Sequence, residues 1–265
     1  PDKLVIGNHQ LSLSLHRHDN ALVMDAIHGS ATDHRQSSDL PIQGNLLTAD
    51  EDGHHQTLTV NSIGPCQVNE VIRHGDHQAQ EVSVSVSGTI GTTAITTTIT
   101  ARSNEPWIHI HHIFNASEDT PFTKIKLLDL SVSDAQVIGT TQGVPVKLGR
   151  FVAMIEHPMA ELSFASSHLT GIIRRAIPLR AHTPVEYTVS ILDCQDRSPR
   201  RAFSDYLEQQ RAHPYHAFLH YNSWYDIGYF TRYTETDALS AIQDLGEPLK
   251  QRGVSLDSFL LDDGW

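Results

Sequence analysis

The hydrophobic periodicity of this chain changes once along its length, near Arg197, and this change limits the folds open to it. From about Leu4 to Asp193, apolar and polar residues alternate in short runs separated by Gly, Asn, Asp and Pro. Alternation with a period of two is typical of β-strands that bury one face. Beyond Arg197, apolar residues recur at helical spacing. The pattern predicts an all-β domain followed by a segment in which strands and helices alternate.

The alternating runs predict a large antiparallel β-sandwich over residues 1–195. The longest run, EVSVSVSGTIGTTAITTTITA at positions 81–101, contains Gly91 where a hairpin turn would fall. The other clear runs occupy positions 11–17, 56–62, 107–114, 124–132, 151–156 and 185–193. About ten to fifteen strands over this length suggest a two-sheet supersandwich in which each strand buries one face.

A linker helix and one βαβ unit are predicted after the sandwich. The run RSPRRAFSDYLEQQRAHP places Phe203, Tyr206 and Leu207 at helical spacing, which indicates a linker helix over residues 196–215. The strand-like run AFLHYNSW follows at positions 217–224, and SFLLDD forms a second strand-like run near the end. A helix between these two strands gives a βαβ unit, whose strands are parallel.

The helix of this unit carries boundary signals. Thr234 is a candidate N-cap with Asp237 three residues later, which is a weak capping box. The apolar stripe is Ala238, Leu239, Ile242 and Leu245. Pro248 predicts a kink or a fresh start near Gly246, and Gly253 predicts the end of the helix.

A single βαβ unit cannot close a sheet. A (β/α)₈ barrel needs about 250 residues, whereas the chain offers roughly 50 after the linker helix. We therefore expect residues 216–265 to be the truncated start of a (β/α)₈ barrel, and the chain to be the N-terminal portion of a longer protein. The predicted fold class is mainly β: a large antiparallel sandwich, a linker helix and the first βαβ unit of an incomplete barrel.

Two adjacent aspartates, Asp262 and Asp263, stand where the last strand ends. Inside a strand they would point to opposite faces, but Gly264 permits a turn that lets both serve one ligand. Binding loops of α/β folds lie at the carboxyl ends of parallel strands, and Trp224 follows the preceding strand. Carboxylates accept hydrogen bonds from sugar hydroxyls and an indole covers the C–H face of the ring. Together these residues favour a sugar site, which Trp265 would border.

Other interpretations of the paired aspartates are weaker. A Mg²⁺ or Ca²⁺ site needs further oxygen ligands, and none stands at a recognisable spacing. Phosphatase-type strand ends have one residue between their aspartates and a small hydroxyl residue after the glycine, whereas Trp265 follows Gly264 here. The plainest alternative is a solvated acidic turn. We expect neither a metal nor a cofactor.

Charge and composition restrict the partners. The net charge of −12, from 31 acidic and 19 basic residues, argues against a nucleic-acid partner. No run of 18 apolar residues indicates a membrane span. Cys66 and Cys194 are far apart and favour two buried free thiols over a disulfide. Pro1 in place of Met indicates processing or truncation, so compartment and oligomeric state stay open.

Histidines and a turn glutamate are further candidates. His109 and His111 share one strand face and could be two metal ligands, although histidines on the polar face of a sandwich are the simpler interpretation. Glu156 lies in the turn Glu-His-Pro, for which an exposed loop is favoured over a site. Tyr225 and Asp226, beside Trp224, are better candidates to border a ligand.

These features carry a family resemblance that runs over essentially the whole chain. A sandwich, a linker helix, a strand ending in HYNSWYD and a strand ending in LLDDGW resemble α-galactosidases of glycoside hydrolase family 36 and the related raffinose-synthase-like enzymes. The stretch GVPVKLGRFVAMIEHPMA at positions 143–160 is similar to a segment in the sandwich of such relatives.

The resemblance implies roles for single residues. Asp262 and Asp263 would accept hydrogen bonds from the galactose 4- and 6-hydroxyls, Trp224 would wall the sugar subsite, and Trp265 would be a neighbour. The family is retaining, with a nucleophile and an acid/base carboxylate about 5 Å apart. Both lie on later barrel strands, beyond residue 265. The resemblance therefore implies an α-galactosidase-like hydrolase whose N-terminal part, taken alone, is inactive.

Three alternatives remain. The sandwich could be a carbohydrate-binding or interaction module without catalysis. Within the enzyme class, the chain could belong to an α-N-acetylgalactosaminidase or a transglycosidase. A metal-dependent phosphohydrolase using the DDG motif is the third.

Overall fold

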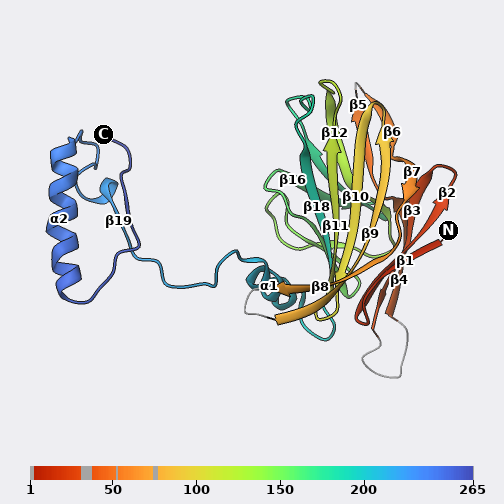
Figure 1. Ribbon diagram of the computed structural model, residues 1–265, viewed down its shortest axis with the longest axis horizontal. Helices are drawn as coiled ribbons and strands as arrows, with labels where there is room; N and C mark the ends of the chain where they lie inside the picture. The colour runs from red at the N-terminus through yellow and green to blue at the C-terminus, as the bar shows by residue number, and fades with distance from the viewer. Residues whose placement is uncertain (1–2, 31–37, 52, 74–76, 265) are drawn as a thin grey trace. The chain divides into compact units, whose positions relative to one another are not determined.

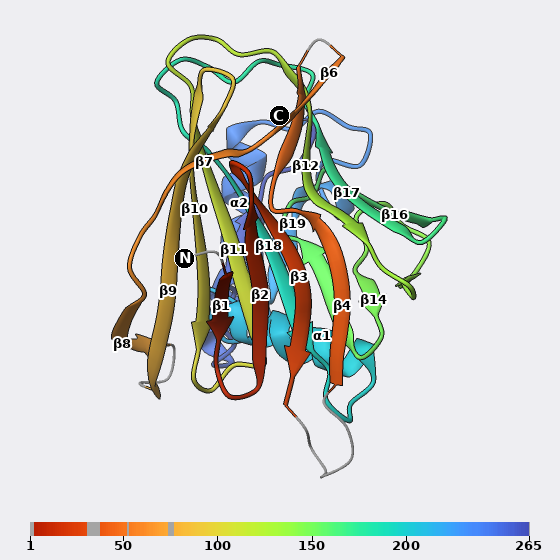
Figure 2. The same ribbon diagram turned by 90° about the vertical axis from the view of Figure 1, so that its right-hand side faces the viewer.

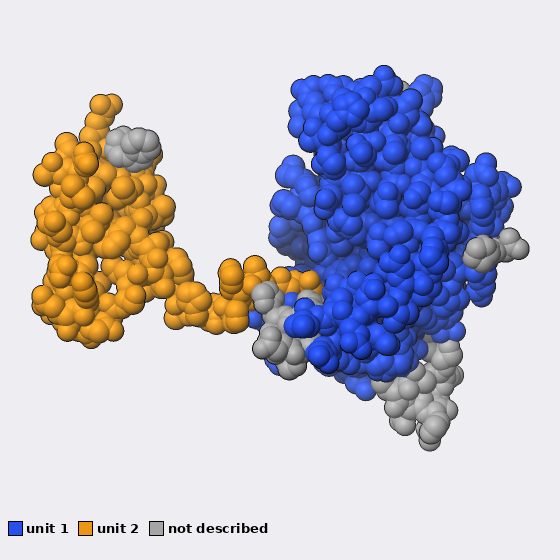
Figure 3. All heavy atoms as spheres, in the orientation of Figure 1, with its two compact units in different colours: residues 1–209 blue, residues 210–265 orange. Residues whose placement is uncertain are grey.

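The computed structural model describes residues 3–30, 38–51, 53–73 and 77–264. The chain forms two compact units, Pro1–Gln209 and Gln210–Trp265, which Figure 3 shows in different colours. Within the described residues, unit 1 consists of two nine-stranded antiparallel sheets and the helix α1. Two antiparallel sheets and few helices confirm the predicted mainly β sandwich.

The first sheet, sheet A, has the strand order β1-β2-β3-β4-β12-β17-β16, with β5 paired to β12 and to β6. Its strands are β1 (Lys3–Gly7), β2 (Leu11–His18), β3 (Ala21–Gly29), β4 (Ser38–Asn45), β5 (Thr48–Glu51), β6 (His54–Thr57), β12 (Phe122–Ser131), β16 (Ala160–Ala165) and β17 (His168–Arg174).

The second sheet, sheet B, has the order β13-β14-β15-β18-β11-β10-β9-β7, with β8 also paired to β9. Its strands are β7 (Thr59–Ile63), β8 (Gln67–Arg73), β9 (His77–Ile90), β10 (Thr93–Arg102), β11 (Trp107–Asn115), β13 (Gln136–Val137), β14 (Val146–Leu148), β15 (Phe151–Ile155) and β18 (Val185–Asp193). Figures 1 and 2 show the two sheets and the long β9–β10 hairpin, which turns at Gly91 with a positive φ of 54°.

Alternating side chains of both sheets build one apolar core. Strand β10 buries every second residue along its length, and the core cluster draws aliphatic and aromatic side chains from both sheets. Full burial of one such side chain contributes about 1.5–3 kcal/mol. The period-two pattern of the sequence therefore fixes which face of each strand points inward.

His112 is a polar exception in this core. It lies on the same face of β11 as Ile110 and Phe114 and is fully buried. Its Nδ1 lies 2.8 Å from Thr97 Oγ1, and among the described residues its Nε2 has no hydrogen-bond partner. Burial, with a smaller contribution from His111, lowers the pKa of His112 to about 3.

Helix α1 (Pro199–Gln210) covers part of the outer face of sheet B. Ala202 and Tyr206 are its buried side chains, and the Tyr206 ring stands 5.2 Å, centroid to centroid, from Trp107. The expected face of Phe203, Tyr206 and Leu207 is therefore partly wrong, because Leu207 stays 45% exposed. A helix that crosses a strand surface buries only a narrow stripe of side chains.

Unit 2 contains the strand–helix–strand arrangement. Its elements are β19 (His220–Asn222), the 3₁₀ turn η1 (Ser223–Tyr225), α2 (Glu235–Gln251) and β20 (Ser258–Leu260). The two strands pair in parallel, with Tyr221 opposite Phe259. The expected strand over residues 217–224 is shorter, because β20 offers only three residues to pair with.

Helix α2 begins as expected but does not break where expected. Thr234 Oγ1 accepts from the Asp237 N–H and the Asp237 carboxylate accepts from the Thr234 N–H, so the capping box is present. The predicted restart near Gly246 is wrong, since α2 continues through Pro248 to Gln251, and the alternative of a kink there stays a prediction. Pro248 lies in the last turn, where its missing N–H removes a single helical hydrogen bond. Gly253, with φ of 72°, follows the C-cap Arg252, as predicted.

The cysteines are both free, but only one is buried. Cys194 lies in the cluster under α1, whereas Cys66 is exposed, so the expectation of two buried thiols is wrong for Cys66. Among the described residues, no helix is long and apolar enough to cross a membrane.

Candidate functional site

The candidate site lies at the carboxyl ends of β19 and β20. Because these strands are parallel and Asn222 pairs with Leu260, the residues that follow each strand meet at one edge. Asn222 Nδ2 donates to Asp262 Oδ2 over 3.1 Å, which joins the two strand ends directly. The structure therefore brings together the NSW and DDG motifs that the sequence had singled out.

Asp262 is held on several sides. Its second carboxylate oxygen, Oδ1, accepts from the Asp263 N–H at 2.8 Å. Its own N–H donates to Ser223 Oγ at 2.8 Å, and its carbonyl oxygen accepts from the Tyr233 hydroxyl at 2.8 Å. Both the side chain and the backbone of Asp262 are thus fixed by neighbours from β19, from η1 and from the segment just before α2.

Asp263 has a different environment. The residue is exposed, and among the described residues no hydrogen bond or ion pair to its carboxylate is present. Its acceptor oxygens are free to take hydrogen bonds from a ligand. The adjacent aspartates therefore have unequal roles in the fold, although the sequence presents them as a pair.

Two glycines, Gly264 in the DDG turn and Gly228 opposite it, allow close packing at this strand end. Gly264 has a φ of 106°, and a Cβ there would stand 2.8 Å from the Thr231 carbonyl oxygen. A Cβ on Gly228 would stand 3.0 Å from the Asp263 carbonyl oxygen. The 228–231 segment thus packs closely against the DDG turn: the positive φ and the short contact favour glycine at position 264, and a Cβ at position 228 would displace its neighbours by a few tenths of an ångström.

Three aromatic rings lie together beside this turn. Trp224 is half-buried, and its ring centroid is 5.0 Å from that of Phe230 and 5.7 Å from that of Tyr229. Phe230 is 81% exposed. The predicted tryptophan therefore lies in unit 2, in a patch that presents aromatic faces to solvent. Trp265, the fourth predicted site residue, lies outside the described residues.

The neighbouring polar residues form a separate contact. The Tyr221 hydroxyl donates to Asp226 Oδ2 at 2.9 Å. Burial, together with the Asp226 carboxylate, raises the pKa of Tyr221 to about 12. Tyr225 is 82% exposed. The expectation that Tyr225 and Asp226 border a ligand stays a prediction.

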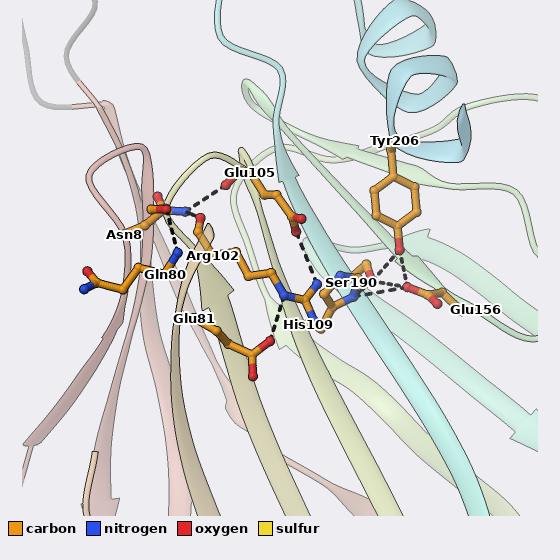
Figure 4. Close-up of polar contacts among 10 residues, drawn as sticks. Asn8, Gln80, Glu81, Arg102, Glu105, His109, Glu156, Ser190 and Tyr206 are labelled. Atoms are coloured by element: carbon orange, nitrogen blue, oxygen red, sulfur yellow. Dashed lines mark hydrogen bonds and ion pairs between the residues drawn. The ribbon is translucent and has the colours of Figure 1, made fainter. Parts of the chain in front are cut away.

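The sequence indicated His109 and Glu156 separately, but not that they lie together in a polar cluster on the outer face of sheet B, which Figure 4 shows. Glu156 Oε1 accepts from the hydroxyls of Ser190 and Tyr206, and His109 Nδ1 lies 3.4 Å from it. The side chain of Glu156 keeps 33% of its exposure, yet these donors outweigh the opposing effect of burial and lower its pKa to about 2. The cluster links α1 to sheet B and has the character of a structural contact.

The two histidines form hydrogen bonds with side chains of the neighbouring strand in sheet B. His109 and His111 lie on the outer face of β11 and contact Ser190 and Thr188 of β18 at 2.9 and 3.0 Å. Across the part of the chain that the structure describes, no group of three or more His, Cys, Asp or Glu side chains could hold a metal ion.

Solved structures of GH36 α-galactosidases share this fold. The enzyme AgaB from Geobacillus stearothermophilus aligns with a TM-score of 0.53 at 12% identity, over 100% of this chain and 49% of its own. A variant of AgaA from the same organism, crystallised with 1-deoxygalactonojirimycin, gives 0.56 at 10% identity, over 99% and 50%. The α-galactosidase from Lactobacillus brevis gives 0.52 at 11%, over 99% and 48%.

This likeness concerns the fold alone, at these identities. The chain spans about half the length of the enzymes it matches. No protein-family model and no curated protein matches the sequence. The β-sandwich of unit 1 matches the N-terminal β-sandwich domain of GH36 enzymes in fold.

Proposed function

We propose that this chain is the N-terminal part of a retaining glycoside hydrolase that acts on α-galactosides. In this proposal residues 1–195 form the sandwich domain, residues 196–215 the linker helix, and residues 216–265 the start of a (β/α)₈ catalytic barrel. The observation that carries it is the DDG turn at the carboxyl end of a parallel strand, in a chain whose whole length aligns with GH36 α-galactosidases.

The chemistry of the strand end fits a neutral sugar. The 4-hydroxyl of galactose and the 6-hydroxyl on its exocyclic carbon are donors at the same edge of the sugar, and carboxylates accept such hydrogen bonds strongly. Asp262 and Asp263 supply these acceptors, while Trp224 and Trp265 would cover the apolar face of the ring. The AgaA variants crystallised with raffinose and with stachyose support a sugar as the ligand class.

The two aspartates are not the catalytic pair in this proposal. Retaining enzymes place the nucleophile and the acid/base on opposite sides of the scissile bond, about 5 Å apart. Asp262 and Asp263 share one turn, and the Asp263 N–H donates to the Asp262 carboxylate. They hold hydroxyls, and the catalytic carboxylates belong to residues of a longer protein beyond position 265. An α-N-acetylgalactosaminidase or a transglycosidase would use the same grip.

Two measurements on this chain test the proposal. The chain should bind galactose in preference to glucose, its C4 epimer, and Asp262→Ala should weaken that binding. The chain alone should release no detectable product from an aryl α-galactoside. Equal binding of the two epimers would overturn the assigned ligand, and robust turnover would overturn the placement of the catalytic residues.

One observation favours the second candidate, a sugar-binding sandwich module. A groove on sheet A is lined by both hydrogen-bond donors and acceptors, among them Lys124, Gln142, Glu161, Thr170 and Arg174. Two results would favour this candidate: galactose binding by residues 1–195 alone, and galactose binding by the full chain that Asp262→Ala does not weaken. Against it, none of the large exposed hydrophobic side chains in the described part of unit 1 is aromatic, so this part offers no exposed aromatic platform for a sugar ring.

A further inference from the structure

The strand-end hydrogen bonds assign different tasks to the two aspartates. Asp262 is half-buried, and each of its carboxylate oxygens already accepts one hydrogen bond, from Asn222 and from the Asp263 N–H. Asp263 is exposed and its carboxylate accepts none within the described residues. The Asp263 carboxylate therefore offers unoccupied acceptor oxygens to a ligand hydroxyl, whereas the Asp262 carboxylate offers oxygens that are already held in one orientation.

The hydroxyls of Ser223 and Tyr233 hold the backbone of Asp262 by hydrogen bonds. The Ser223 hydroxyl lies 3.1 Å from the Tyr233 hydroxyl, and Tyr233 donates to the Asp262 carbonyl oxygen. Because each hydroxyl carries one proton, Ser223 donates to Tyr233 and its oxygen accepts from the Asp262 N–H. Ser223 is fully buried and Tyr233 is 7% exposed. The arrangement leaves no donor of the pair unpaired.

Tyr233 also clasps the far side of the turn. Its N–H donates to the Gly264 carbonyl oxygen over 3.0 Å, while its hydroxyl holds Asp262. The residue between these two contacts is Asp263. Tyr233 thereby spans the turn and fixes the direction in which the Asp263 side chain leaves the backbone.

Asn222 couples the aspartate to the tryptophan. Its Oδ1 accepts from the Trp224 N–H at 2.8 Å, and its Nδ2 donates to Asp262. The Asn222 side chain therefore fixes both the backbone of Trp224 and the orientation of the Asp262 carboxylate.

We propose that Tyr233, Ser223 and Asn222 are positioning residues of the sugar site, which hold the turn that carries Asp263. This inference rests on the proposed function, since it takes galactose hydroxyls as the ligand. The Tyr233–Ser223 pair sets the turn so that Asp263 meets a sugar hydroxyl without reorganisation, and sites held in this way lose affinity when the supporting contacts are removed.

The test compares galactose affinity among variants of the whole chain, with glucose as the reference sugar. Asp263→Asn should weaken galactose binding by at least about tenfold, the order expected for a lost hydrogen bond to a charged group. Tyr233→Phe keeps the ring and removes the clasp, and it should weaken binding roughly three- to tenfold. Tyr215→Phe, at a tyrosine 76% exposed, is the matched control and should leave affinity unchanged.

A double variant separates positioning from general damage. If Tyr233 acts through Asp263, then Tyr233→Phe should add little in a chain that already carries Asp263→Asn. Equal losses in both backgrounds would show a merely structural role and overturn the inference. Hydrogen exchange at the Asp262 amide provides a readout without sugar: it should speed up in Tyr233→Phe and in Ser223→Ala, and an unchanged rate in both would contradict the clasp.

The two proposals fail in different ways. If the wild-type chain does not prefer galactose to glucose, the proposed function is wrong and the positioning role falls with it. If the preference is present and Asp263→Asn abolishes it while Tyr233→Phe does nothing, the proposed function stands and only the clasp is overturned.

Discussion

Unit 1 and unit 2 bury their side chains in opposite ways. Unit 1 collects aliphatic and aromatic residues from two sheets into one core and leaves few large apolar side chains in contact with solvent. In unit 2 the buried side chains are mainly Tyr221, Ser223, Tyr233, Ala238 and Ala241. All the exposed Phe and Tyr side chains among the described residues lie in this unit. The difference places most of the buried apolar packing in the sandwich and leaves exposed aromatic side chains around the strand end, where we propose the ligand binds.

The polar groups divide in the same way. In unit 1 the Arg150 guanidinium forms a two-pronged ion pair with the fully buried carboxylate of Asp193, at 2.7 and 2.5 Å, and this pair secures the fold near α1. In unit 2 the Asp263 carboxylate is left without such a partner among the described residues. The buried Asp193 carboxylate needs its arginine, because removing one partner of a buried ion pair is strongly destabilising, whereas an exposed acceptor is available to a ligand.

The largest expected contrast is in packing. Phe122→Ala removes a side chain that is 1% exposed in the sandwich core and should cost about 3–5 kcal/mol in the free energy of unfolding. Phe230→Ala, at a ring 81% exposed in unit 2, should change it by less than about 0.5 kcal/mol. Chemical denaturation followed by circular dichroism measures both. Similar losses would show that unit 2 carries stability that its burial does not account for.

Acid should destabilise unit 1. The pKa of His112 is lowered from 6.5 to about 3 in the fold, so between these values the unfolded chain binds a proton that the folded chain does not. Stability is therefore full above about pH 6.5 and falls toward pH 3, by on the order of a few kcal/mol. Glu156, lowered from 4.5 to about 2, adds a loss that begins below about pH 4.5.

The pH dependence can be assigned by substitution. His112→Gln should flatten the loss between pH 6.5 and 4.5, whereas His54→Gln, at an exposed histidine on β6, should leave it as in the wild type. Urea unfolding at several pH values provides the profile. A profile that His112→Gln leaves unchanged would refute the assignment to the buried imidazole.

The smallest expected effect concerns the start of α2. Thr234→Ala removes the capping box and should destabilise the helix by about 1 kcal/mol. Thr236→Ala, two residues later and also exposed, should have a much smaller effect. Hydrogen exchange along α2 reports the difference, and equal protection in the two variants would show that tertiary contacts, not the cap, hold this end of the helix.

Much of the fold could be predicted from local pattern. Period-two alternation located β2, β9, β10, β11, β12 and β18 closely, because burying one face of a strand requires it. The inward position of His112 could also be predicted from the sequence, because residues two positions apart on a strand lie on the same face and Ile110 and Phe114 are apolar. The sequence left open whether the helix restarts near Gly246, and α2 does not restart there because Pro248 lies in its last turn.

The site was only partly predictable. The sequence indicates Asp262, Asp263 and Trp224 because they follow two parallel strands. It does not reveal that Ser223 and Tyr233 fix Asp262, since these contacts join residues 29 to 39 positions apart through tertiary structure. The sequence shows only that a serine and a tyrosine stand near the two motifs, and the structure is needed to show that both are buried against Asp262.

The central claim is that the strand end of unit 2, and not the sandwich, holds the sugar. The direct measurement is a two-dimensional amide NMR titration of the whole chain with galactose and, in parallel, with glucose. We predict galactose-specific shifts confined to Asn222–Tyr233 and Asp262–Gly264, lost in Asp263→Asn. Shifts centred instead on Lys124, Glu161 and Arg174 of sheet A, and unchanged in that variant, would contradict the account.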